Sequence, residues 1–143
     1  MAAKYVQKVI PSVSTARLKG LTLTELRKDT LNLYNRYCVD KVCRNKHIGI
    51  PIQFKNSGGR KTARGEAIYS KKVAIIKYLP CLMENATYNN FGRPKEKDSA
   101  SLIGYYNFKA YVFIDGKKEC IRLSVKARAD GSFYYNVEVN KVK

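Results

Sequence analysis

The stretch NFKAYVFIDGKKECIRLSVKARADGSFYYNVEV, residues 107–139, decides the fold of this chain. Apolar and polar residues alternate through it in three runs, which is the two-residue period of strands with one buried face. The runs are separated by Asp-Gly dipeptides at 115–116 and 130–131, and Asp-Gly is typical of tight hairpin turns. The sequence therefore predicts an antiparallel meander of three strands within residues 106–142.

The alternation gives the predicted meander two unlike faces. The residues of one face are apolar: Phe108, Ala110, Val112, Ile114, Ile121, Leu123, Val125, Ala127, Phe133, Tyr135, Val137 and Val139. The other face consists mainly of cations and aromatic rings: Lys109, Tyr111, Phe113, Arg122, Ser124, Lys126, Arg128, Tyr134, Asn136 and Glu138. There, cations could hold phosphate while rings stack unpaired bases. An ordinary solvated face with cross-strand pairs is the alternative interpretation.

Two helices and a further strand are predicted upstream. Thr22 and Glu25 have the spacing of a capping box, and leucines recur on one face of the helix that follows, at 23–38. Residues 48–54 alternate as a strand, which Pro51 places at or near the edge of the sheet. A second apolar helical face lies near 67–87 and is the expected partner of the meander, although Pro80 should kink or divide this helix.

The fold class is therefore α+β, in a chain whose 143 residues fit one domain with a core of its own. Residues 1–20, with Pro, Ser, Gly and scattered basic residues, are predicted to be a flexible basic arm, and 21–143 a single α+β domain. No run is apolar enough for a membrane span or a signal peptide, so we expect a cytoplasmic protein.

Charge is the strongest indication of function. Lys and Arg total 28 against 11 acidic residues, a net charge of +17, and a polyanion would relieve the resulting self-repulsion. Ten basic residues and one acidic residue lie between Lys41 and Met83, so more than half of the net charge is concentrated there. This clustering favours a binding surface over solubility alone, and nucleic acid is the expected partner.

The candidate nucleic-acid contacts come from a basic, glycine-rich loop at 55–65 and from the polar face of the meander. They are Lys55, Arg60, Lys61, Arg64, Lys109, Tyr111, Arg122, Lys126 and Arg128. Glycines in the loop allow backbone amides to approach an anion, but the loop lacks the P-loop pattern.

Candidates for catalysis are few. His47 could act as a general acid or base, or it could be a surface or packing residue. Glu66 could act as a base, or it could be a first-turn residue of the second helix. Without paired carboxylates or clustered metal ligands, the reaction best supported is metal-independent RNA cleavage, with Tyr134 as a third candidate group.

The four cysteines contain no C-x-x-C pair and only one histidine accompanies them, so a zinc site would need an unusual ligand set. Buried free thiols are the preferred interpretation. The sequence predicts neither a metal nor a cofactor.

Three runs resemble the phage and mobile-element domains of the barnase, EndoU, colicin and RelE type, which occur in large polyvalent phage proteins. The runs are IGIPIQFKNSGGRKT at 48–62, KYLPCLMENATY at 77–88 and NFKAYVFIDGKKECIRLSVKARADGSFYY at 107–135. The resemblance implies a helix packed on a curved antiparallel sheet that holds RNA on its exposed face. It also implies phosphate contacts by Arg60, Lys61, Arg122 and Lys126, with Tyr134 or Ser124 in the cleft.

EndoU enzymes use two histidines, whereas only His47 is present here, ahead of the first strand of this resemblance. The RelE branch uses basic and tyrosine residues instead. Our leading hypothesis is a basic phage protein that binds RNA or single-stranded nucleic acid in the host cytoplasm and could also cleave RNA. The alternative is a non-enzymatic interaction protein, for host takeover or as an anti-CRISPR inhibitor, that acts on a host ribonucleoprotein.

Overall fold

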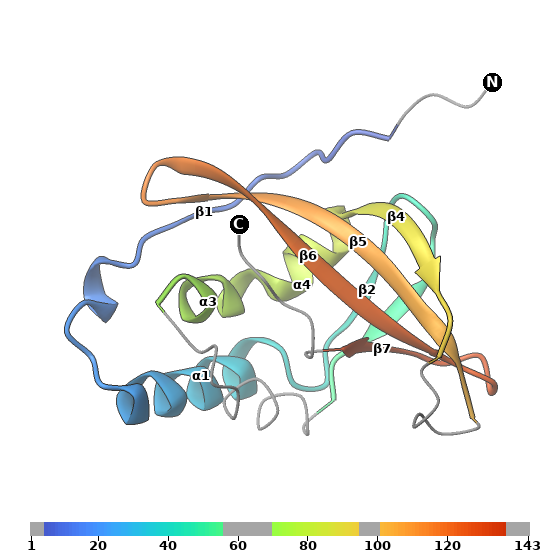
Figure 1. The fold of residues 1–143 in the computed structure, drawn as a ribbon, viewed down its shortest axis with the longest axis horizontal. Helices are drawn as coiled ribbons and strands as arrows, with labels where there is room; N and C mark the ends of the chain where they lie inside the picture. The colour runs from blue at the N-terminus through green and yellow to red at the C-terminus, as the bar shows by residue number, and fades with distance from the viewer. Residues whose placement is uncertain (1–4, 56–69, 95–100, 137–143) are drawn as a thin grey trace.

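The computed structural model describes residues 5–55, 70–94 and 101–136. Within these ranges the chain forms a mixed, curled sheet of seven strands with helices on one of its sides (Figure 1). The strand order is β1-β5-β6-β7-β3-β2, and β4 also pairs with β5. In this part of the chain no helix is long and apolar enough to cross a membrane.

The predicted meander forms the centre of the sheet. Strands β5 (Leu102–Ile114) and β6 (Lys117–Arg128) are antiparallel over almost their full lengths, and β7 (Phe133–Asn136) continues the pattern on the far side of β6. The turn between β5 and β6 has positive φ at both Asp115 (52°) and Gly116 (81°), as a tight hairpin of this hand requires. Residues predicted to extend the third strand beyond 136 lie outside the described ranges.

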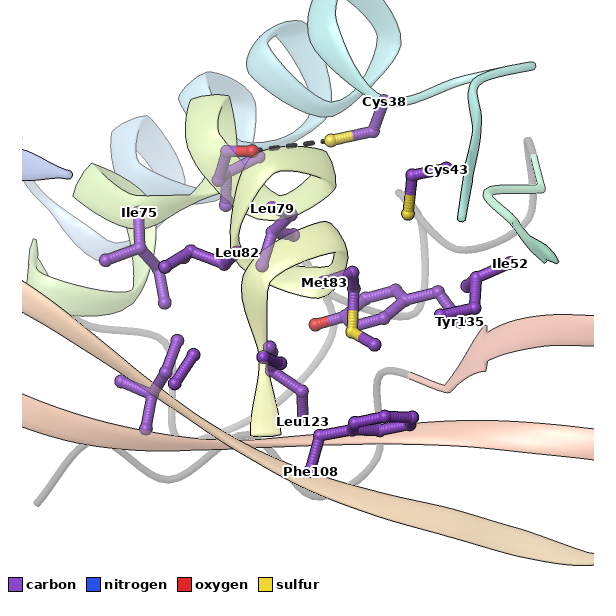
Figure 2. Packing of buried hydrophobic residues seen from close by; sticks show 14 of the residues in the cluster. Cys38, Cys43, Ile52, Ile75, Leu79, Leu82, Met83, Phe108, Leu123 and Tyr135 are labelled. Carbon is purple, nitrogen blue, oxygen red and sulfur yellow. Dashed lines mark hydrogen bonds between the residues drawn. The ribbon is translucent and has the colours of Figure 1, made fainter. Parts of the chain in front are cut away.

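The inner face of the meander carries the core, and the apolar alternation of β5 and β6 is buried as predicted. Helix α4 (Leu79–Asn85) supplies Leu82 and Met83, which point toward Leu123 of β6 and Phe108 of β5 (Figure 2). All four side chains are at most 2% exposed. Their burial is a main source of the hydrophobic stabilisation of the domain.

The second predicted helix is divided rather than continuous. Its described part consists of α3 (Ser70–Ile75), a 3₁₀ turn η2 (Ile76–Tyr78) and α4. Pro80 occupies the first turn of α4, where its missing N–H leaves no helical hydrogen bond unmade, so the chain restarts a helix at the proline. The helix ends at residue 85, two residues before the predicted boundary.

Helix α1 (Leu23–Tyr37) begins with the predicted capping box: Thr22 Oγ1 accepts from the Glu25 N–H, and the Glu25 carboxylate accepts from the Thr22 N–H. The helix packs on α3 and η2. Its buried residues are Leu26, Thr30 and Tyr34, whereas Leu23, which we expected on the apolar face, is 45% exposed. Thr30 remains inside because its hydroxyl bonds the Leu26 carbonyl.

The strand predicted at 48–54 is shorter, and it lies near the edge of the sheet as predicted, one strand in from it. Strand β3 (Pro51–Gln53) pairs with β2 (Val42–Arg44) on one side and, in parallel, with β7 on the other. The unpredicted β2 therefore forms this edge of the sheet. The isoleucines before Pro51 belong to the connection between β2 and β3, so their alternation does not reflect a strand.

Three separate segments form hydrogen bonds with β5 at the opposite edge of the sheet. Strand β4 (Thr87–Gly92) pairs with its first half, and β1 (Ser12–Val13) pairs in parallel with its end. Between them the side-chain amide of Gln7 bonds the main chain of Tyr111, accepting from its N–H (2.7 Å) and donating to its carbonyl (2.9 Å). Residues 5–15, expected as part of a flexible arm, thus lie against the sheet, and the short 3₁₀ turn η1 (Ala16–Leu18) follows them.

Candidate nucleic-acid interface

The outer face of the sheet, away from the helices, is cationic. Lys109 of β5 lies directly opposite Arg122 of β6 in the antiparallel register, and both side chains are exposed. Like charges in this position repel each other. The same face of β6 also carries Lys118, Lys126 and Arg128. Such a row of cations favours an anion between or above them.

No carboxylate lies beside Lys109 and Arg122 on the described outer face of β4 to β7. The one acidic residue within these four strands is Glu119, and it points to the inner side. There it is 6% exposed, and its carboxylate accepts from Lys71 Nζ of α3 at 2.8 Å. This ion pair fixes α3 to the inner side of the sheet, away from Lys109 and Arg122.

A polar hollow of about 400 Å³ opens between the two opposed cations. Besides Lys109 and Arg122, the residues that line it include Asn89, Asn90 and Asn107. Asparagine amides offer both donors and acceptors, the groups that read the edges of unpaired bases. The hollow therefore combines charges for phosphate with amides for a base.

A β-bulge shapes this hollow. The register between β4 and β5 shifts between Tyr88 and Asn90, so that Asn89 is the extra residue. Bulges redirect side chains and occur often beside functional sites. Asn89 also lines a second hollow, of about 330 Å³. Lys109 likewise lines both hollows.

Further cations gather around Tyr134 at the β7 end of the outer face. Lys126 lies opposite Tyr134 in the register of β6 and β7. Lys55 Nζ is 3.7 Å from the centroid of the tyrosine ring, and Arg128 Cζ is 5.7 Å from it. The structure thus brings three of the predicted contact residues together around Tyr134, which was predicted as a catalytic candidate. Three other predicted contacts, Lys109, Tyr111 and Arg122, lie farther along the same face.

The remaining predicted residues, from the basic loop and the catalytic candidates, are not seen beside these contacts. Glu66 and the loop cations Arg60, Lys61 and Arg64 lie outside the described residues. His47 is described, but its contacts are with Tyr5 and Tyr88, and among the described residues none joins it to Tyr134.

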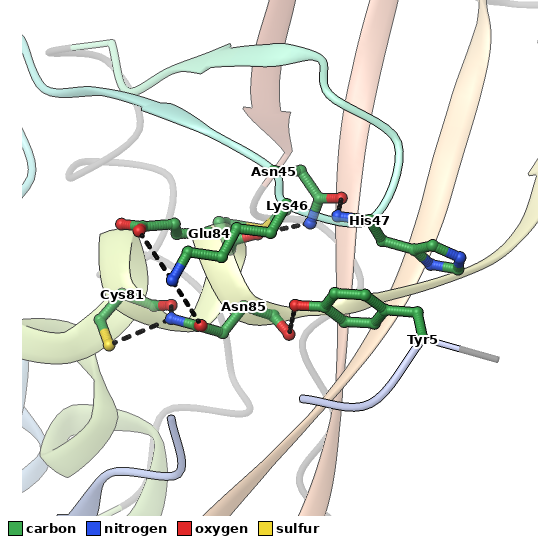
Figure 3. A network of polar contacts seen from close by, with 8 residues as sticks. Tyr5, Asn45, Lys46, His47, Cys81, Glu84 and Asn85 are labelled. Atoms are coloured by element: carbon green, nitrogen blue, oxygen red, sulfur yellow. Dashed lines mark hydrogen bonds and ion pairs between the residues drawn. The ribbon is translucent and has the colours of Figure 1, made fainter. Parts of the chain in front are cut away.

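His47 lies in the connection between β2 and β3, which Asn45 fixes against the end of α4 (Figure 3). Asn45 is fully buried, and its Oδ1 accepts from the N–H groups of His47 and Ile48. Its Nδ2 donates to the carbonyls of Met83 (2.7 Å) and Ala86 (2.9 Å) at the C-terminal end of the helix. All four hydrogen bonds of the amide are made, so the connection is rigidly placed.

The imidazole of His47 is held on two sides. Its ring stacks on that of Tyr5 with centroids 4.7 Å apart, and its Nδ1 accepts from the Tyr88 N–H at 2.9 Å. A neutral ring that accepts at Nδ1 carries its proton on Nε2. The Tyr5 hydroxyl donates to the Asn85 carbonyl at 3.2 Å, so the N-terminal segment also reaches the end of α4 (Figure 3). These contacts indicate a packing role for His47.

Sequence reasoning missed the amide side chains of this surface. Gln7 contacts a strand more than a hundred residues away, and nothing in its neighbourhood indicates this. Asparagines at 85, 89 and 90 were the available sign of an amide-rich surface near β4. They did not predict a strand, because Asn is depleted in strands.

The four cysteines are free, as predicted. Cys38 and Cys43 are buried, and burial raises the pKa of both thiols to about 12, so they remain protonated and unreactive. Cys81 and Cys120 are only partly buried.

Comparison with protein-family models gives one match, described as large polyvalent protein-associated domain 3, over residues 22–135. Neither the curated proteins nor the solved structures gave a match. The matched region contains the opposed cations and the polar hollow, whereas residues 5–21 precede it. The match supports the expected phage-associated domain, and the nuclease fold of the barnase, EndoU, colicin and RelE type is not confirmed. The chain belongs to the large polyvalent protein-associated domain 3 family.

Proposed function

We propose that this domain binds RNA or single-stranded nucleic acid on the outer face of its sheet. The observation that carries the proposal is the direct opposition of Lys109 and Arg122 across β5 and β6, with no carboxylate on the described part of that face. A phosphate between the two cations would replace repulsion by two attractions, and its counterions would be released.

The polar hollow favours a single strand over a duplex. Its asparagine amides can reach the Watson–Crick edge of a base only when that edge is free of its pairing partner. Tyr134, between Lys55 and Arg128, and Tyr111, farther along the face, supply rings beside cations, as surfaces that bind single strands do. The proposal is one of binding, because the described contacts of His47 indicate packing rather than proton transfer.

The salt dependence of binding tests this proposal. We expect Lys109→Ala/Arg122→Ala to weaken the binding of a fluorescein-labelled single-stranded RNA of twelve nucleotides, measured by anisotropy over a KCl series. If the pair together neutralises one phosphate, the slope of log K against log salt falls in magnitude by about 0.7. Because the pair repel each other, the free energy of unfolding should not decrease.

The matched control is Lys19→Ala/Lys28→Ala, which also removes two exposed cations. Lys19 follows η1 and Lys28 lies in α1, so neither belongs to the outer face of the sheet. Its salt slope should equal that of the wild-type protein. Equal slopes for all three proteins would mean that the opposed cations do not contact phosphate, and the proposed surface would be wrong.

A further inference from the structure

We infer that the second hollow is a stacking subsite for the base next to the nucleotide held at Lys109 and Arg122, an inference that rests on the proposed function. The two hollows share Asn89 and Lys109, so a strand can pass from one into the other. The volume of about 330 Å³ is within the range of pockets that hold small organic ligands.

The lining of this second hollow differs from that of the first. It is mainly apolar, with Val6, Ile10 and Tyr111 among its residues. Val6 is 64% exposed and the Tyr111 ring 43% exposed, so both remain open to solvent at its mouth. Apolar surface exposed in a concave site is stabilised when a flat ring covers it.

The charges around the hollow identify the kind of ring. Lys109 and Lys118 both line it, and no described lining residue is acidic. Lys118 Nζ lies 4.7 Å from the centroid of the Tyr111 ring. The occupant that suits an apolar, ring-containing site beside two ammonium groups is a nucleobase attached to phosphate.

The N-terminal segment forms one wall of this subsite and is firmly held. The Gln7 amide bonds both main-chain groups of Tyr111, as a neighbouring strand would. Tyr5 stacks on His47 at the other end of the segment. Residues 5–10 precede the part matched by the family model, so this wall lies outside the matched region.

An abasic probe tests the inference. Two fluorescein-labelled RNA hexamers are compared by anisotropy at fixed salt: hexauridylate, and a hexamer with the same phosphates but abasic ribose units. We expect the wild-type protein to bind hexauridylate about tenfold more tightly, which corresponds to stacking of one base. Tyr111→Thr and Val6→Gln should remove most of this preference, whereas the salt slopes of both variants stay as in the wild-type protein.

Two matched controls accompany these variants. Tyr111→Phe keeps the ring and should keep the preference, and Val9→Gln changes a 45% exposed valine of the same segment that does not line the hollow. Equal binding of both hexamers by the wild-type protein, or an undiminished preference in Tyr111→Thr, would overturn the stacking subsite while the salt-slope result for Lys109 and Arg122 still supported the binding surface. Failure of the protein to bind either hexamer would overturn both proposals.

Discussion

At Gly104 in β5, an added Cβ atom would lie 2.4 Å from the Gly92 carbonyl oxygen and 2.4 Å from the Phe91 ring. The carbonyl belongs to the backbone of β4, so the neighbouring strand would have to move. We therefore expect Gly104→Ala to lower the free energy of unfolding by about 1–3 kcal/mol, measured by urea denaturation. The shift of β4 would also displace the bulge that places Asn89 in both hollows.

Gly92, which contacts the same region, gives the matched control. A Cβ there would meet only Asn107 Nδ2, at 3.5 Å, which is an ordinary contact. Gly92→Ala should therefore change stability little. Equal losses in the two variants would show that the cost comes from replacing a strand glycine as such and not from the close approach of β4.

At the scale of elements, the attachment of β1 to the sheet depends on a carboxylate. Asp115 accepts from the Thr15 N–H (2.8 Å) and from the Thr15 hydroxyl (2.5 Å), immediately after β1. These hydrogen bonds lower the pKa of Asp115 below its ordinary value. Because the folded-state pKa is lower than the unfolded one, the stabilisation is complete above the ordinary pKa and is lost as pH falls through the folded-state value.

Asp115→Asn tests this dependence. Asparagine tolerates the positive φ of this turn position and can still bond Thr15, but it does not titrate. We expect the wild-type protein to be the more stable of the two near pH 6, and this advantage to disappear as the pH falls toward 3, in urea denaturation at a series of pH values. A difference that is constant over this pH range would mean that the ionisation of Asp115 does not hold β1.

Elements with a local sequence signal were the predictable ones. The capping box at Thr22 and Glu25 predicts the start of α1, and the Asp-Gly turn predicts the hairpin of β5 and β6, because each depends on residues adjacent in sequence. Strands β1, β2 and β4 were missed. Strand β1 depends on a partner far along the chain, β2 has only three residues, and β4 contains asparagines, which are depleted in strands.

The candidate site likewise has a part that the sequence predicts and a part that it does not. Alternation alone predicts that Lys109 and Arg122 share a face, and the register places them opposite each other. The amides of Asn89 and Gln7 could not be predicted, because one depends on a bulge and the other on a contact between the N-terminal segment and β5. The charged part of the surface is therefore a property of local pattern, and its hollows are a property of tertiary structure.

For the whole molecule, the net charge of +17 should dominate the response of stability to salt. Ion pairs of the described residues include Arg17–Asp29, Lys46–Glu84 and Lys71–Glu119, and of these three only the last has a buried partner. Screening thus weakens few favourable pairs and many unfavourable ones. We expect the Tm to rise as NaCl increases from about 10 to 150 mM, where the Debye length falls from about 30 to 8 Å.

Single-stranded RNA should raise the Tm further at constant salt, since a ligand that binds only the folded state stabilises it. Differential scanning fluorimetry measures both effects. In Lys109→Ala/Arg122→Ala the rise in Tm caused by RNA should be smaller, because the phosphate contacts are lost. The rise in Tm with NaCl should persist, because most of the excess charge remains. A Tm that falls with NaCl in this range would show that the few ion pairs outweigh the general repulsion, and would remove self-repulsion as a reason for the domain to hold a polyanion.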